Sequence, residues 1–178
     1  SGCDKTLHDM NRKYDVSYFK NKISKIRNIR PNISITTDVI VGFPGETAED
    51  FNITLNNIKE INFSKVHVFP YSVRKGTKAE TMPNQIDENT KKTRVHKLLQ
   101  LSKELEINYM NKFIGKSIEF LSEVYNNGFL VGHTGNYLLI KCKSDKAILN
   151  KDLNVTITNV EYPYCIATLQ DINKLNWL

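Results

Sequence analysis

The stretch ITTDVIVGFPGETAEDF, residues 35–51, decides the fold. It begins as a run rich in β-branched residues that becomes apolar on both faces, which is typical of a strand inside a parallel sheet. The segment from Gly42 to Glu46 is short and contains two glycines, so it predicts a tight turn. Thr47 can then cap a helix whose first turn carries Glu49, an acidic residue suited to the helix dipole. The stretch therefore predicts a strand, a turn and a helix.

The neighbouring segments extend this pattern in both directions. A helix is predicted over 15–29, with Asp15 as its cap and Pro31 beyond its end. After the helix that starts at Thr47, residues 65–72 predict a second strand. Helices that alternate with strands favour a parallel sheet with right-handed crossovers.

A long helix is predicted over residues 87–113. Its apolar residues are expected to form one buried stripe of Val95, Leu98, Leu99, Leu105 and Tyr109. The same helix carries the cations Lys91, Lys92, Arg94 and Lys97. These four side chains either face solvent without a specific role or add to an RNA-binding surface.

The pattern changes at Gly115, where alternating apolar residues replace helical spacing. The pair Asn127-Gly128 is a strong hairpin signal. Five short strands are predicted, at 116–125, 129–134, 136–143, 153–160 and 164–171. A small closed barrel buries such strands better than a flat sheet, and an OB-like barrel suits this length. We therefore expect an α/β domain over 1–112 and an all-β barrel over 113–178.

The net charge of the 178-residue chain is +6, and it is unevenly distributed. Residues 1–112 contain 19 Lys and Arg against 13 Asp and Glu, whereas residues 113–178 contain 6 of each kind. The basic excess indicates an anionic partner such as nucleic acid, or a solvated basic surface without a partner. Because no apolar run is long enough for a bilayer span and no signal-peptide pattern opens the chain, we expect a soluble, cytoplasmic protein without a membrane partner.

The three cysteines, Cys3, Cys142 and Cys165, are far apart and form no CxxC pair. This spacing argues against a disulfide framework and against a zinc site built within the chain. We expect reduced thiols with structural roles or none, and we predict no metal ligand in the chain.

The turn at Gly42 to Glu46 also has the position of a ligand site. It is neither GxxxxGK[ST] nor GxGxxG, so it can be a simple connection. In parallel α/β folds, however, ligands lie beyond the carboxyl ends of the strands. Residues 1–14 and 70–79 are expected at the same rim, so the two alternatives stay open.

Four segments together resemble one family. They are SGCDKTLHDMNRKY (1–14), TTDVIVGFPGETAEDF (36–51), KVHVFPYSVRKGTKAETMPNQI (65–86) and the final barrel, in this order. The residues of these motifs and their order along the chain are similar to those of the radical S-adenosylmethionine methylthiotransferases. Within that family, the branch that acts on threonylcarbamoyladenosine in tRNA is most similar.

This resemblance implies an enzyme longer than the chain, with an N-terminal cluster domain, a radical S-adenosylmethionine (β/α) barrel and a C-terminal TRAM domain that binds RNA. Residues 1–112 would be the last part of that barrel, with its connecting helix, and 113–178 the TRAM domain. The reaction would add a 2-methylthio group to N6-threonylcarbamoyladenosine in the anticodon stem-loop of tRNA. The cofactors would be S-adenosylmethionine and two 4Fe-4S clusters.

The chain departs from the family in lacking the CxxxCxxC motif. We therefore expect no catalytic residue in this chain, no turnover by the chain alone and no tightly bound cofactor. Two alternatives remain, a non-catalytic RNA-binding module and a methylthiotransferase that acts on a ribosomal protein. A barrel that is interrupted in this way would leave a strand edge and apolar surface open, so self-association and local disorder near residues 1–35 are also expected.

The resemblance also assigns site residues. The predicted cofactor contacts are Ser1, Gly2, Arg12, Asp38, Gly42, Phe43, Pro44 and Glu46. Asp38 is polar within an apolar run, which a ligand-lined interior or a structural hydrogen bond would explain. Arg12 can pair with the cofactor carboxylate, or it can be a surface charge.

The predicted RNA contacts combine cations with aromatic rings, which attract phosphates and stack on unpaired bases. In the first domain they are Tyr71, Arg74, Lys75 and Lys78. In the barrel they are Tyr125, Phe129, His133, Tyr137, Lys141 and Lys143. Each barrel aromatic can instead be part of the core, and His133 can be a surface histidine without a ligand.

Overall fold

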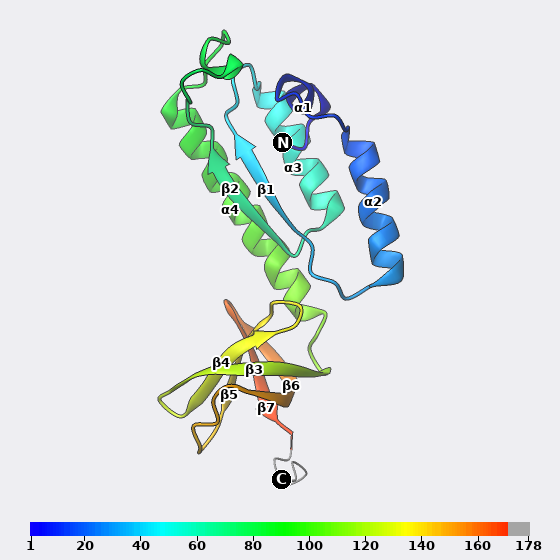
Figure 1. The fold of residues 1–178 in the computed structure, drawn as a ribbon, viewed down its shortest axis with the longest axis vertical. Coiled ribbons are helices and arrows are strands. Elements are labelled where there is room, and N and C mark those ends of the chain that lie inside the picture. The colour runs from blue at the N-terminus through cyan, green and yellow to red at the C-terminus, as the bar shows by residue number, and fades with distance from the viewer. Residues whose placement is uncertain (171–178) are drawn as a thin grey trace. The chain divides into compact units, whose positions relative to one another are not determined.

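The structure is a computed structural model that describes residues 1–170, and these form two compact units (Figure 1). The first unit is Ser1–Glu106 and the second begins at Ile107. The elements of the first unit are α1 (Asp4–Asp9), α2 (Val16–Ile29), β1 (Thr36–Val41), α3 (Ala48–Ile61), β2 (Lys65–Pro70), the 3-10 helix η1 (Lys78–Glu80) and α4 (Glu88–Asn111), which passes the point of division. The assignment of 1–112 and 113–178 to two named domains remains a prediction.

Strands β1 and β2 form a two-stranded parallel sheet, as the alternation of helices and strands predicts. Val41 of β1 and Val66 of β2 belong to one buried core with Phe51 and Ile58 of α3 and Leu98 of α4. The burial of this apolar surface is what holds strands and helices together.

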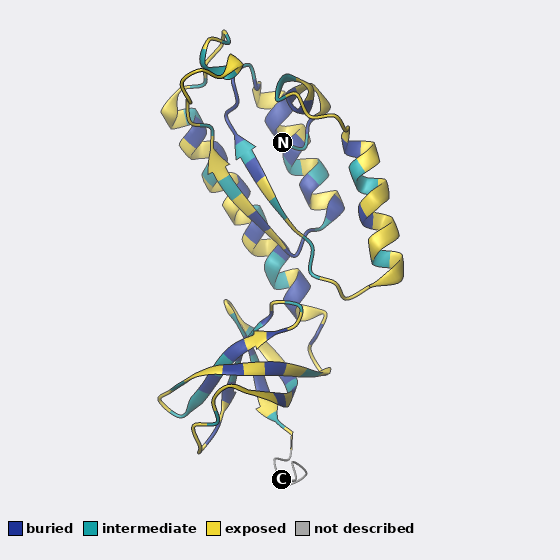
Figure 2. Cartoon of the chain, in the orientation of Figure 1, coloured by how far each residue is buried: buried dark blue, intermediate teal, exposed yellow. Residues whose placement is uncertain are grey.

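The opposite face of the sheet is open among the described residues (Figure 2). Asp38 on β1 is paired in register with His67 on β2, and both residues are exposed. Phe69, two residues further along β2, is 50% exposed. Asp38 therefore lies on the uncovered face of the strand, which explains how a carboxylate is tolerated in this apolar run.

The helix starts follow the sequence signals. Asp15 accepts a hydrogen bond from the backbone N–H of Tyr18 at 2.7 Å and caps α2. Thr47 and Asp50 form a capping box at the start of α3, each side chain accepting from the other's backbone N–H. The predicted helices are thus confirmed, whereas the short helix α1 was not predicted.

One side chain of α4 protects an edge of the sheet. Ser102 Oγ accepts a hydrogen bond from the backbone N–H of Val66 and donates one to the carbonyl oxygen of the same residue, both at 3.0 Å. These two backbone groups would otherwise be unpaired at the edge of β2.

The second unit is a closed barrel with strand order β3-β4-β5-β7-β6. Its strands are β3 (Ser117–Asn126), β4 (Phe129–Thr134), β5 (Leu139–Lys143), β6 (Lys151–Glu161) and β7 (Tyr164–Leu169). All neighbouring pairs are antiparallel except β5 and β7, which are parallel. The predicted small closed barrel is confirmed over the described residues, and the predicted end of the last strand at Asp171 lies outside them.

The barrel core contains Phe120, Leu130 and Ile157 together with the thiols of Cys142 and Cys165, all of them buried. Burial raises the pKa of each of these two thiols to about 11. The third thiol, Cys3, is buried in the first unit.

Two glycine positions shape the barrel. Asn127 and Gly128 both have positive φ values, of 48° and 79°, so the predicted hairpin turn is present. Gly132 on β4 crosses β3 so closely that an added Cβ would lie 1.8 Å from the carbonyl oxygen of Leu121.

Among the described residues, no helix is long and apolar enough to cross a membrane.

Candidate functional site

One cavity of about 830 Å³ lies in the first unit. Much of its lining comes from three segments that are distant in the sequence: residues 1–14 with α1, the middle of β1, and the loop that follows β2. Residues of α2 and α3 complete the wall. Residues 1–14 and 70–79, which were expected at one rim, therefore lie around one space, whereas only Phe43 of the Gly42–Glu46 turn lines it. The volume lies within the range of about 300–1,000 Å³ that is usual for small-molecule sites.

The cavity brings some of the predicted site residues together and leaves others out. Of the predicted cofactor contacts, it is lined by Ser1, Gly2, Arg12, Asp38 and Phe43. Of the predicted RNA contacts, it is lined by Tyr71, Arg74 and Lys78. Gly42, Pro44, Glu46 and Lys75 are not among its lining residues.

An aromatic pair forms part of the cavity wall. The rings of Phe43 and Tyr71 meet edge to face, with centroids 5.2 Å apart and planes at 73°. The ammonium of Lys91 lies 5.5 Å from the centroid of the Tyr71 ring. The hydroxyl of Tyr71 is buried and has no hydrogen-bond partner among residues 1–170, so it is available to a polar group of a ligand.

Gly42 is required at its position for two reasons. Its φ of +73° lies in the left-handed region, which favours glycine. A Cβ at this position would also lie 2.5 Å from Cγ of Lys91. The close approach that Gly42 allows is therefore that of the Lys91 side chain, which comes from α4.

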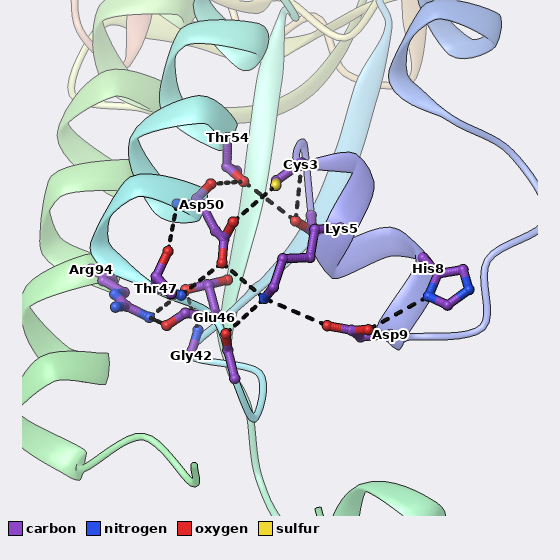
Figure 3. Close-up of polar contacts among 12 residues, drawn as sticks. Cys3, Lys5, His8, Asp9, Gly42, Glu46, Thr47, Asp50, Thr54 and Arg94 are labelled. Carbon is purple, nitrogen blue, oxygen red and sulfur yellow. Dashed lines mark hydrogen bonds and ion pairs between the residues drawn. The ribbon is translucent and has the colours of Figure 1, made fainter. Parts of the chain in front are cut away.

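Glu46 is turned into the protein and pairs with α4 (Figure 3). Its carboxylate accepts a hydrogen bond from the backbone N–H of Gly42 at 2.9 Å and one from Arg94 at 2.6 Å. Burial raises the pKa of Glu46 above its usual value, although the Gly42 N–H and the Arg94 charge oppose this shift. The carboxylate thus has two protein partners in place of the ligand amine or hydroxyl for which it was considered.

A second polar cluster joins α1 to the start of α3 (Figure 3). Lys5 Nζ donates to the carbonyl oxygen of Gly45 at 2.9 Å and to the carboxylate of Asp50 at 3.1 Å. The thiol of Cys3 also donates to Asp50, at 3.5 Å. Burial alone would raise the pKa of Asp50, but the Thr47 N–H, the Lys5 ammonium and the other donors together lower it to about 2.

In the second unit, a cation lies over two aromatic rings. The ammonium of Lys141 on β5 is 4.5 Å from the ring centroid of Phe129 on β4 and 5.3 Å from that of Tyr164 on β7. The three side chains come from neighbouring strands and are partly exposed. Tyr164 was not predicted, and its position next to Lys141 in the barrel could be found only from the strand order.

The other predicted barrel residues differ in exposure. Tyr137 is 82% exposed and has a φ of 62°, which is uncommon for an aromatic residue. His133 pairs with Glu123 at 2.9 Å. Tyr125 packs partly against the core, and its hydroxyl donates to the carbonyl oxygen of Ser144 at 3.3 Å. Lys143 is exposed.

The cations of α4 correct one expectation and show what sequence reasoning missed. Lys91 and Arg94 are 4% and 7% exposed, so they are not solvent-facing, whereas Lys92 and Lys97 are exposed as expected. Lys91 and Arg94 lie at i and i+3 on the stripe that continues to Leu98, and this spacing was the available signal. Leu99, which was predicted on the buried stripe, is 48% exposed.

The comparisons with known proteins extend over most of the chain. The threonylcarbamoyladenosine tRNA methylthiotransferase MtaB of Bacillus subtilis (strain 168) is 40% identical over 169 residues, which are 92% of this chain and 38% of that protein. The protein of the same name from Thermotoga maritima is 43% identical over 139 residues, or 78% of this chain and 32% of that protein. The tRNA-2-methylthio-N(6)-dimethylallyladenosine synthase of Alkaliphilus oremlandii is 39% identical over 161 residues, which are 88% of this chain and 34% of that protein.

The chain therefore spans about a third of the length of these curated relatives, and it corresponds to their C-terminal part. No protein-family model matches the chain. The identities, which lie well above 30%, agree with the motif resemblance found in the sequence. The chain belongs to the family of tRNA methylthiotransferases.

Proposed function

We propose that the chain is part of a radical S-adenosylmethionine enzyme that adds a 2-methylthio group to N6-threonylcarbamoyladenosine beside the anticodon of tRNA. The observation that carries this proposal is the similarity to two MtaB proteins, at 40% and 43% identity. The cavity supports it, because the three motif segments within the first unit surround one space of suitable size.

In this proposal, residues 1–112 are the last part of a (β/α) barrel and S-adenosylmethionine occupies the cavity. The residues present fit such a group, since the wall offers an aromatic pair for a purine and the Arg12 guanidinium for a carboxylate. The unpaired hydroxyl of Tyr71 adds a donor and acceptor for a ribose hydroxyl. The bound cofactor would supply the radical and the methyl group, while the chain's own residues hold it and exclude water.

The iron–sulfur clusters do not fit the residues described here. No group of three His, Cys, Asp or Glu side chains within residues 1–170 is arranged to hold a metal ion. The three cysteines are buried in two different units. In this proposal the cluster ligands therefore belong to a part of the enzyme outside residues 1–170.

The barrel is the proposed RNA-binding TRAM domain. Its strand order, with a single parallel pair between β5 and β7, supports an OB-like barrel, a fold that binds oligonucleotides on one face. The group of Phe129, Lys141 and Tyr164 offers rings for base stacking and a cation for phosphate. Tyr137, which is almost fully exposed, adds a second stacking surface.

In the first unit, Arg74, Lys75 and Lys78 are exposed, and Arg74 and Lys78 are among the residues that line the cavity. We propose that they attract the phosphates of the anticodon stem-loop, while the modified base enters the cavity. Because the barrel residues 113–178 carry as many acidic as basic side chains, shape and stacking would contribute more there than net charge.

The test uses the full-length enzyme, reconstituted with its clusters, together with three tRNA preparations and, in a separate reaction, ribosomal protein. One carries threonylcarbamoyladenosine, one carries dimethylallyladenosine and one carries unmodified adenosine at the same position. Mass spectrometry of the nucleosides should detect a 2-methylthio product only from the first. A product only from the second would assign the chain to the other tRNA branch, to which relatives at 33% to 47% identity belong by name. Activity on a ribosomal protein alone would overturn the proposal.

A further inference from the structure

A buried ion pair connects the turn beside the cavity with α4. Arg94 and Glu46 are 48 positions apart in the sequence, and their residues are 7% and 2% exposed. The same guanidinium nitrogen of Arg94 donates to the Glu46 carboxylate at 2.6 Å and to the Glu46 carbonyl oxygen at 3.1 Å. The carboxylate in turn accepts from the Gly42 N–H at 2.9 Å. One side chain of α4 therefore reaches both the side chain and the backbone of the turn.

The rest of the turn is also held by hydrogen bonds. The backbone N–H of Glu46 donates to the carbonyl oxygen of Phe43, and the N–H of Gly45 donates to that of Asn84, both at 2.9 Å. On the other side, Lys5 from α1 donates to the carbonyl oxygen of Gly45 (Figure 3). Phe43 is the residue of this turn that lines the cavity, and it meets Tyr71 there.

Stability alone does not account for a buried ion pair at this place. The desolvation of two charges offsets much of their attraction, so a well-packed apolar pair is often equally stable. A charge pair that bonds two separate backbone groups instead fixes a local geometry, because moving the turn would leave a buried charge without its partner.

We propose that Arg94 is a positioning residue, which acts through Glu46 to hold the Gly42–Glu46 turn and thereby sets Phe43 against the ligand of the cavity. The identity of that ligand as S-adenosylmethionine rests on the function proposed above. The positioning itself does not, because it concerns the turn and α4 within this chain.

The experiment compares Arg94→Met, Arg94→Lys and the control Lys92→Met in the full-length enzyme. Met removes the charge and keeps much of the length, Lys restores a charge, and Lys92 is an exposed cation two positions away on the same helix. Two quantities decide the proposal: hydrogen exchange of the peptide that covers residues 42–46, and the dissociation constant of S-adenosylmethionine at equilibrium. The KM and kcat of each variant are measured as well.

We expect Arg94→Met to speed exchange in the turn and to weaken S-adenosylmethionine binding by about 2- to 10-fold, the loss expected when one aromatic contact is misplaced. Arg94→Lys should recover part of the affinity, and Lys92→Met should match the wild type in both measurements. The KM for S-adenosylmethionine should rise more than kcat falls, since the proposal concerns ground-state positioning.

The proposal would be overturned if a folded Arg94→Met enzyme showed the wild-type rate of hydrogen exchange in residues 42–46 and the wild-type affinity for S-adenosylmethionine. If that variant does not fold, Glu46→Gln takes its place, because it keeps the size of the side chain and removes the charge that Arg94 pairs with. Unchanged turn exchange and unchanged affinity in Glu46→Gln would also overturn it. A wild-type enzyme that does not bind S-adenosylmethionine would contradict the proposed cofactor, whereas the exchange data would still decide the role of Arg94.

Discussion

Gly132 on β4 provides a sharp test of the barrel, because its lack of a side chain allows two strands to cross. In Gly132→Ala, the new Cβ would lie 1.8 Å from the carbonyl oxygen of Leu121 and 3.1 Å from the backbone nitrogen of Glu123. Real Cβ atoms essentially never lie within 3.0 Å of a non-bonded heavy atom. The two strands must therefore separate locally by more than 1 Å. Since the obstacle is backbone, a change of side-chain rotamer cannot relieve it.

The size of the effect follows from the ladder that is disturbed. The closest register pairs are Leu121 with His133 and Ser122 with Gly132. Loss of two or three backbone hydrogen bonds, at about 1 kcal/mol each, predicts a destabilisation of about 2–3 kcal/mol. Hydrogen exchange of β3 and β4 peptides, measured by mass spectrometry under native conditions, should therefore be faster by roughly 30- to 150-fold.

Gly135→Ala is the matched control. No atom lies within 4 Å of a Cβ at that position, and its φ is not in the left-handed region. We expect exchange at the wild-type rate or slightly slower, since alanine restricts the unfolded chain. Equal exchange rates in Gly132→Ala and Gly135→Ala would refute the close crossing of β3 and β4 on which the reasoning depends.

Three further predictions concern binding, pH and association. Lys141→Met should weaken binding of an anticodon stem-loop RNA about 3- to 10-fold. It should also reduce the slope of log affinity against log salt concentration by about one, because one phosphate contact is lost. Lys146→Met should have no effect in the same titration. The folded pKa of Asp50 is about 2 and an unfolded aspartate has about 3.9, so its stabilising contribution is present above about pH 4 and is lost as the pH falls toward 2. The difference in unfolding temperature between wild type and Asp50→Asn should shrink over that range, and a constant difference would contradict the assignment. Phe69→Lys, on the uncovered sheet face, should reduce self-association of the 178-residue chain in light scattering, and an unchanged mass distribution would exclude that face as its cause.

Local chemistry made much of the fold predictable. Asp15 and Thr47 mark the helix starts because their side chains accept from backbone groups a few positions away, and the hairpin at Asn127-Gly128 needs only those two residues. The helix α1 was not predicted, since its cap position carries Cys3, which makes no side-chain cap bond. Its anchoring comes from residues far along the chain, such as Asp50 through Lys5.

The candidate site was predictable in position and less so in its contacts. The rule that strand ends share one rim placed Phe43 and Tyr71 near the same space, and they are in contact. The partner of Glu46 was not predictable from local sequence, because Arg94 follows 48 positions later on another helix. A stripe of buried positions that contains a cation was the only local sign, and hydrophobic periodicity alone does not distinguish such a cation from a solvated one.

The two thiols in the barrel core have a consequence for how such a protein tolerates iron and oxidants. With a pKa of about 11, Cys142 and Cys165 remain almost entirely protonated at neutral pH, and a protonated, enclosed sulfur is a poor nucleophile and a poor iron ligand. Peroxide or ferrous ions in solution would thus leave these two thiols unchanged. Their sulfur atoms therefore serve as packing in the core of the barrel.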